Sequence, residues 1–129
     1  MKLHLGCGTK KFPGFINVDI RPEVKPDVVL DITKISSQFQ DVELIVASHV
    51  LEHFPRKPSR FASVTVEEVL ADWYKALRSG GTLRLSVPDF EVCARLYLKT
   101  LDIMNERGSP LPTFYGLITG GQKNDYDFH

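Results

Sequence analysis

The sequence has few cysteines, no net charge and no long apolar run, and each of these features excludes a class of protein. Cys7 and Cys93 are the only cysteines and stand in no metal-ligand spacing, so a reducing compartment is expected. Sixteen basic residues balance sixteen acidic ones, which gives no bias toward nucleic acid or an anionic membrane. No stretch approaches the roughly 20 apolar residues that cross a bilayer or the apolar core of a signal peptide. We therefore expect a cytoplasmic protein without nucleic-acid or membrane partners.

The length of the chain fits one domain. A chain of 129 residues is too short for two domains of ordinary size. Hydrophobic residues make up 43% and charged residues 25%, which is typical of a globular protein. We expect a single domain over residues 1–129. Residues 109–129 contain two prolines, three glycines and few periodic apolar residues, and so predict a loop-like tail.

Short apolar segments alternate with longer amphipathic ones along the chain. Five segments have the composition of strands, at residues 3–5, 15–20, 27–31, 43–48 and 82–87. The fourth has a continuous apolar middle, which is typical of a strand buried on both faces. Strands that alternate with helices predict an α/β fold with a mostly parallel sheet.

Two segments have the apolar stripe of a helix, at residues 66–77 and about 90–107. Thr65 and Glu68 form the pattern of a capping box before the first helix, and Gly80 is expected to close it. Trp73 lies in the apolar stripe of this helix and is expected in the core. An interface role is its alternative.

Polar or glycine residues follow every predicted strand. The first strand is followed by residues 6–9 (GCGT), the second and third end near Asp19 and Asp31, the fourth is followed by residues 48–53 (SHVLEH), and the fifth by Asp89. Ligands of open parallel sheets bind beyond the carboxyl ends of the strands. The sequence therefore predicts a binding site at this edge.

Each of these residue types suits one part of a nucleoside ligand. Gly6 and Gly8 allow a sharp turn and a close approach of the backbone to a ligand. Asp19 can accept hydrogen bonds from both hydroxyls of a ribose, and Asp31 from an exocyclic amine. A tight turn is the alternative for the two glycines, and a turn or a helix cap is the alternative for each aspartate.

Three segments together resemble class I S-adenosylmethionine-dependent methyltransferases, in the branch known as methyltransferase type 11. Residues 3–8 (LHLGCG) resemble the first motif of that family. Residues 47–54 (ASHVLEHF) resemble the segment after its fourth strand, and residues 77–83 (LRSGGTL) the turn before its fifth. The resemblance spans residues 3 to about 98, with the motifs in the family's order.

The resemblance implies a Rossmann-like sheet flanked by helices, with S-adenosyl-L-methionine as the cofactor and no metal ion. It implies methyl transfer by direct displacement to a small-molecule or saccharide-type acceptor. His49 and His53 are the candidate catalytic residues, because a histidine can take a proton from an acceptor hydroxyl or amine near neutral pH. The cofactor-binding residues it implies are Gly6, Cys7, Gly8, Thr9, Asp19, Ile20, Asp31, Ile32, Ser48 and His49.

The sequence departs from the family in two places. Only ten residues lie between Gly8 and Asp19, so the usual first helix is expected to be missing or reduced to a turn. The family's two antiparallel edge strands after the fifth strand are not expected either, which predicts a C-terminally truncated domain. An uncovered fifth strand would expose unpaired backbone groups, so we expect a homodimer.

Three other functions compete with methyl transfer. A dinucleotide-binding oxidoreductase would need a glycine where Lys11 stands. A zinc hydrolase is suggested by the string His49-x-x-Glu52-His53, which would have to lie within one helix. A non-catalytic, methyltransferase-like binding module is the third alternative.

Overall fold

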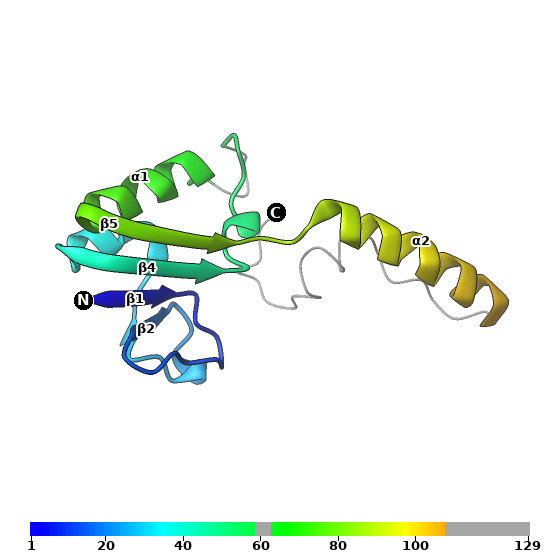
Figure 1. The fold of residues 1–129 in the computed structure, drawn as a ribbon, viewed down its shortest axis with the longest axis horizontal. Helices are drawn as coiled ribbons and strands as arrows, with labels where there is room; N and C mark the ends of the chain where they lie inside the picture. Colours follow the sequence, from blue (N-terminus) through cyan, green and yellow to red (C-terminus); the bar gives the residue numbers. More distant parts are fainter. Residues whose placement is uncertain (59–62, 108–129) are drawn as a thin grey trace. The chain divides into compact units, whose positions relative to one another are not determined.

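A computed structural model of the chain describes residues 1–58 and 63–107. The described residues form two compact units (Figure 1). The first unit, Met1–Val87, contains the sheet, and the second begins at Pro88 and contains α2, Phe90–Arg107. The helix predicted at about 90–107 is therefore confirmed. The predicted tail, residues 109–129, lies outside the described residues.

The first unit is built on a five-stranded sheet in which every pair of neighbouring strands is parallel. The strands are β1 (Lys2–Leu5), β2 (Ile16–Asp19), β3 (Val28–Val29), β4 (Val42–Ser48) and β5 (Leu77–Ser86). Their order in the sheet is β3-β2-β1-β4-β5. The α/β class and the parallel pairing are confirmed.

The helical segments of this unit lie in the connections between strands. α1 (Val66–Ala76) connects β4 to β5, as the sequence predicts. Three short 3-10 helices were not predicted: η1 (Pro22–Val24), η2 (Ile32–Ser37) and η3 (Leu51–His53). A segment of three to six residues is too short to show a helical period, so its sequence gives no clear signal. No helix in the described part of the chain is long and apolar enough to cross a membrane.

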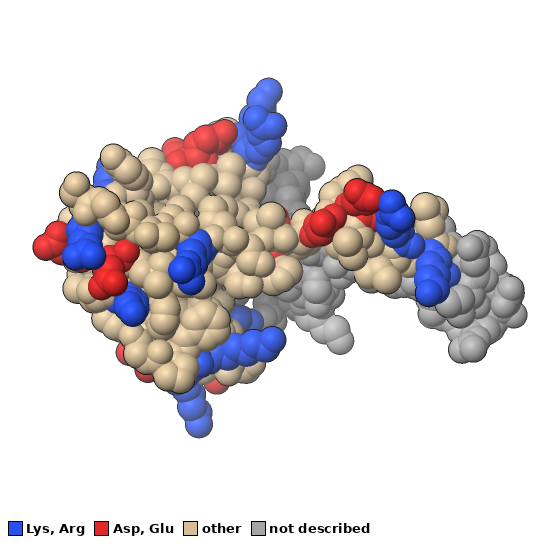
Figure 2. All heavy atoms as spheres, in the orientation of Figure 1, with Lys and Arg blue, Asp and Glu red and all other residues tan. Residues whose placement is uncertain are grey.

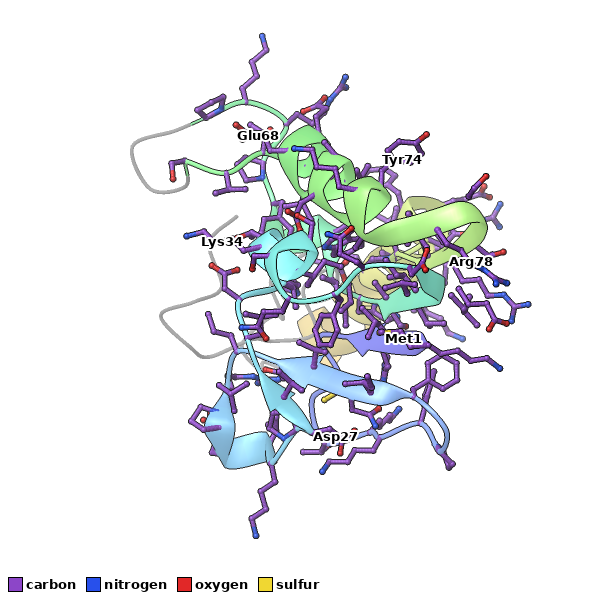
Figure 3. The ribbon with its side chains drawn as sticks, turned by 90° about the vertical axis from the view of Figure 1, so that its left-hand side faces the viewer. Met1, Asp27, Lys34, Glu68, Tyr74 and Arg78 are labelled. Carbon is purple, nitrogen blue, oxygen red and sulfur yellow. The ribbon has the colours of Figure 1, made fainter. Side chains whose placement is uncertain are left out.

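The start of α1 is fixed by the predicted capping box. The Thr65 hydroxyl accepts a hydrogen bond from the Glu68 backbone N–H at 3.3 Å, and the Glu68 carboxylate accepts one from the Thr65 backbone N–H at 2.8 Å. Both donors belong to the first turn, where no helical carbonyl is in reach. Figure 3 shows Glu68 at this end of α1 and η2 on the same side of the sheet as α1.

The apolar core lies between the sheet and the layer formed by α1 and η2. Its fully buried side chains include Leu3, Leu5, Val18, Ile35, Ile45, Val69 and Trp73. Trp73 also donates its indole N–H to the Ile32 carbonyl at 2.7 Å, which ties α1 to η2. The core position predicted for Trp73 is confirmed.

The opposite face of β1 and β2 is covered by the loop of residues 6–15. This loop consists of turns rather than a helix, as the short spacing between Gly8 and Asp19 predicts. The Phe12 ring stacks on His4 with ring centroids 3.9 Å apart. His4 in turn makes a 3.1 Å hydrogen bond to Asn17, its partner in the β1–β2 register. This face of β1 and β2 therefore carries the polar residues His4 and Asn17, whereas a helix packed on it would need apolar side chains there.

Three predictions at element ends need correction. The third strand, predicted over residues 27–31, has only two residues. α1 ends at Ala76, and the chain turns to extended backbone at Leu77, so Gly80 does not close the helix. β5 begins at Leu77, because Leu77 pairs with Val42 before a register shift, and regular pairing resumes at Thr82.

The fourth strand also differs from expectation. Ile45 and Ala47 are buried against the core, but Leu44 and Val46 on the other face are only half-buried. The apolar middle of β4 therefore does not mark burial on both faces within the described residues.

Candidate functional site

The carboxyl ends of the five strands lie at one edge of the sheet because all pairs are parallel. Gly6–Gly8 follow β1, Asp19 ends β2, Asp31 lies beyond β3 and His49 follows β4. The chain progresses from β1 out to β3 and then returns to place β4 on the other side of β1. The strand order thus reverses between β1 and β4, and such a switch point is where open α/β sheets bind ligands.

Asp19 holds the loop after β1 against the end of β2. Its carboxylate accepts a hydrogen bond from the Gly8 backbone N–H at 2.8 Å and one from the Arg21 backbone N–H at 3.0 Å. The Arg21 guanidinium also donates to it, at 3.1 Å from Nε and 3.4 Å from Nη2. Asp19 is only 3% exposed, and these hydrogen bonds hold its carboxylate in one orientation.

The charge of Asp19 is maintained by these donors. Burial raises the pKa of the carboxyl, but the hydrogen bonds from the Arg21 side chain and from the backbone N–H groups of Arg21 and Gly8 lower it further than burial raises it. The pKa therefore lies below the ordinary 3.8. Asp19 is an anionic acceptor at neutral pH, as hydrogen bonding to a ribose requires.

Gly6 brings the loops after β1 and β4 into contact across the switch point. Its φ is +61°, and a Cβ atom at this position would lie 2.6 Å from Cγ2 of Val50. Gly8 also has a positive φ, +52°, but an added Cβ would have only Nη2 of Arg21 within 4 Å, at 3.6 Å. Gly6 is thus required by protein packing, whereas Gly8 leaves its backbone open except for the Arg21 side chain.

The other two residues of the glycine loop contribute differently. Cys7 is buried, and its backbone N–H donates to the Val18 carbonyl at 3.1 Å, which extends the β1–β2 pairing. Burial, followed by the negative charge of Asp19, raises the pKa of the Cys7 thiol, so the thiol stays protonated at neutral pH. Thr9 is exposed at the end of the loop.

Asp31 is the N-cap residue of η2. Its Oδ1 accepts hydrogen bonds from the Thr33 N–H at 2.9 Å and the Thr33 hydroxyl at 2.8 Å. This is the capping alternative that the sequence left open. Ile32 is half-buried, and its carbonyl accepts the hydrogen bond from the Trp73 indole. Ile20 directly follows β2 and is 44% exposed.

Ser48 ends β4 beside β5, and His49 follows it. Ser48 pairs with Ser86, and the His49 backbone N–H donates to the Ser86 carbonyl at 2.8 Å. His49 has a φ of +55°, an uncommon conformation for a residue with a Cβ atom. Its exposed ring places Nδ1 3.3 Å from a carboxylate oxygen of Glu52, whose side chain is only 10% exposed. Glu52 therefore orients the His49 ring.

His53 lies at the end of η3 and is half-buried, in contrast to His49. The two histidines do not share a helix, because η3 covers only Leu51–His53 and His49 precedes it with a positive φ. The helix that the zinc-hydrolase alternative requires is therefore not formed. Among residues 1–58 and 63–107, no group of three or more His, Cys, Asp or Glu side chains is placed to hold a metal ion.

The structure gives roles to three residues to which the family resemblance assigned none. Arg21 covers Asp19 and Gly8, Val50 fills the space beside Gly6, and Glu52 contacts His49. Arg21 and Glu52 each lie two or three residues beyond a predicted site residue, on the same strand-end loop. For Arg21 that proximity is the only signal in the sequence, whereas Glu52 also belongs to the string His49-x-x-Glu52-His53.

The charged side chains of the first unit are mixed on one face. On the face that Figure 2 shows, cationic and anionic side chains are interspersed over the sheet-containing unit. No protein-family model, no curated protein and no solved structure matches the chain.

Proposed function

We propose that the chain is a class I methyltransferase domain with a Rossmann-like sheet, which binds S-adenosyl-L-methionine at the carboxyl edge. One observation carries the proposal. The ionised Asp19 carboxylate, held in one orientation, and the Gly8 backbone lie beside the point where the strand order reverses. A ribose needs paired acceptors, and a flexible amino-acid moiety needs backbone without Cβ atoms in the way. The sequence resemblance assigns these same residues to the cofactor.

The residues present fit the two ends of this cofactor. Asp19 would accept from the ribose hydroxyls, and the loop of Gly6, Cys7, Gly8 and Thr9 would contact the methionine moiety. Asp31 and Ile32 would flank the adenine, with Ile20 beside the ribose. Ser48 and His49 would border the sulfonium across the switch point. When bound, the cofactor supplies an electrophilic methyl group on a positively charged sulfur.

The chain's own part in the reaction is to align the acceptor and to remove its proton. His49 is better placed for proton removal than His53, because its ring is exposed at the strand end and Glu52 orients it through Nδ1. Nε2 of His49 would then accept the proton of a hydroxyl or amine as the acceptor forms its bond to carbon. We propose a small-molecule or saccharide-type acceptor and a cytoplasmic location.

Asp19→Ala tests the proposal. We expect it to weaken the binding of S-adenosylhomocysteine by about 1.5–3 kcal/mol, the range for hydrogen bonds to a charged group. Isothermal titration calorimetry measures this directly. Glu23→Ala is the matched control, because it removes an exposed carboxylate from η1 near Asp19 and should leave affinity unchanged. Unchanged affinity in a folded Asp19→Ala protein would refute the ribose assignment, and a wild-type protein that does not bind would refute the proposal.

The homodimer is a second part of the proposal. β5 lies at one edge of the sheet among the described strands, and a strand edge offers unpaired backbone groups to another chain. We expect light scattering at several concentrations to give twice the 14.6 kDa mass of the chain. A constant mass of one chain would exclude the dimer.

A further inference from the structure

The Arg21 side chain occupies the part of Asp19 that a ribose would use. The guanidinium forms an ion pair with the carboxylate, and its Nη2 lies 3.6 Å from the position of a Cβ on Gly8. Arg21 therefore covers both the acceptor and the open glycine of the proposed site. No feature of the sequence resemblance assigns a role to Arg21.

The carboxylate has no room for both the guanidinium and a diol. An ionised carboxylate offers about four acceptor positions. Four donors already use them: the backbone N–H groups of Gly8 and Arg21, and Nε and Nη2 of Arg21. The two hydroxyls of a ribose bring two more donors, so two of the present donors must leave.

The guanidinium is the group that can leave. The two backbone N–H groups belong to the main chain at the strand ends: the Gly8 loop is held by the Cys7–Val18 hydrogen bond, and Arg21 lies two residues beyond the end of β2. The Arg21 side chain is 34% exposed and long, whereas the Asp19 side chain is 4% exposed. The arginine can turn toward solvent without exposing the core, and the carboxylate cannot.

We propose that Arg21 closes the ribose position of Asp19 in the free protein and is displaced when the ligand binds, so that it sets the affinity of the site. This inference rests on the proposed function, since it concerns the same carboxylate. Asp19 keeps its two backbone donors throughout and exchanges two guanidinium donors for two hydroxyl donors. The ligand must therefore break the ion pair, which lowers its apparent affinity.

The first test compares the binding of S-adenosylhomocysteine to the wild-type protein, Arg21→Ala and Lys34→Ala by isothermal titration calorimetry. We expect Arg21→Ala to bind about fivefold tighter, because a partly exposed ion pair is worth up to about 1 kcal/mol. Lys34→Ala also removes one exposed cation, but on η2 (Figure 3), and should bind as the wild type does. Added salt should tighten wild-type binding and leave Arg21→Ala unchanged, because salt screens the ion pair.

The second test is a double-mutant cycle with Asp19→Ala. If Arg21 acts only by occupying Asp19, removing Arg21 should not change affinity once Asp19 is absent. Equal or weaker binding by Arg21→Ala, in a wild-type protein that binds, overturns the inference and leaves the proposed function standing. A wild-type protein and an Arg21→Ala variant that both fail to bind overturn the proposed function, and the inference with it.

Discussion

Two connections between neighbouring parallel strands are stabilised in opposite ways. The connection from β4 to β5 contains α1, which buries Val69, Trp73 and Ala76 against the sheet. The connection from β1 to β2, residues 6–15, has no helix and covers polar strand residues instead. The comparison shows that a parallel connection too short for a helix can be held by hydrogen bonds to one buried amide.

That amide belongs to Asn17. Its Oδ1 accepts a hydrogen bond from the Phe12 N–H at 2.8 Å, and its Nδ2 donates to the Phe15 carbonyl at 3.2 Å and to Asp27 at 2.7 Å. Asp27 also accepts the Asn17 backbone N–H at 2.8 Å. The Asn17 side chain thus connects the loop and β2 to Asp27, the residue before β3. In the connection from β4 to β5, the apolar face of α1 has the corresponding role.

The largest expected effect is on the helical connection. Trp73→Ala should lower the free energy of unfolding by about 3–5 kcal/mol, because it removes a fully buried ring and leaves a cavity. Urea denaturation measures this change. Tyr74→Ala, at the next position and 78% exposed, should change stability by less than about 0.5 kcal/mol. Similar losses in the two variants would show that α1 is not held by burial.

The loop connection should respond less strongly. Asn17→Ala should cost about 1–3 kcal/mol, because it leaves buried donors and acceptors of the loop without their partner. Gln40→Ala is the control, since its exposed amide makes a surface hydrogen bond to the Ser36 carbonyl. A loss as large as that of Trp73→Ala would contradict the distinction between the two connections, and no loss would show that the loop needs no such anchor.

The smallest effect is the pH dependence of the same network. Hydrogen bonds from the backbone and side chain of Asn17 lower the pKa of Asp27 below its ordinary 3.8. A group whose pKa is lowered by folding stabilises the fold above its ordinary pKa, and this contribution is lost as the pH falls through the lowered value. The stability of Asp27→Asn should therefore fall below that of the wild type near pH 7, and the difference should shrink as the pH falls below the ordinary pKa of 3.8. A difference independent of pH would contradict the charge contribution.

The sequence predicted most of the first unit because its signals are local. The alternation around Leu3, the capping pair Thr65 and Glu68 and the apolar stripe around Trp73 are all visible within a few residues. The 3-10 helices were missed because they are too short to show a helical period, and the early start of β5 because it depends on a neighbour in space. Leu77 is extended since it pairs with Val42, which no local pattern at Leu77 shows.

The candidate site was predicted in position but not in detail. Parallel pairing alone brings Gly6, Asp19 and His49 to one edge, so strand prediction was sufficient for that step. The Arg21–Asp19 ion pair depends on a side-chain rotamer, and the Gly6–Val50 approach on a contact between distant loops. Asn17 alternates with Ile16 and Val18 in the predicted strand, which places it on the face away from the core, and no local pattern shows that a loop buries this face.

The close approach of Gly6 to Val50 has a consequence for the order in which the protein can be assembled. The edge of the sheet at this point is made of contacts between residues far apart in the chain: Gly6 with Val50, and His49 with Ser86. During synthesis the amino-terminal strands emerge first, and β1 has no β4 beside it until residue 48 has been made. Contacts of such long sequence separation form slowly, because the loop between them must close first. The glycine turn can therefore meet Val50 only once residue 50 has emerged from the ribosome, and His49 can pair with Ser86 only once β5 has emerged.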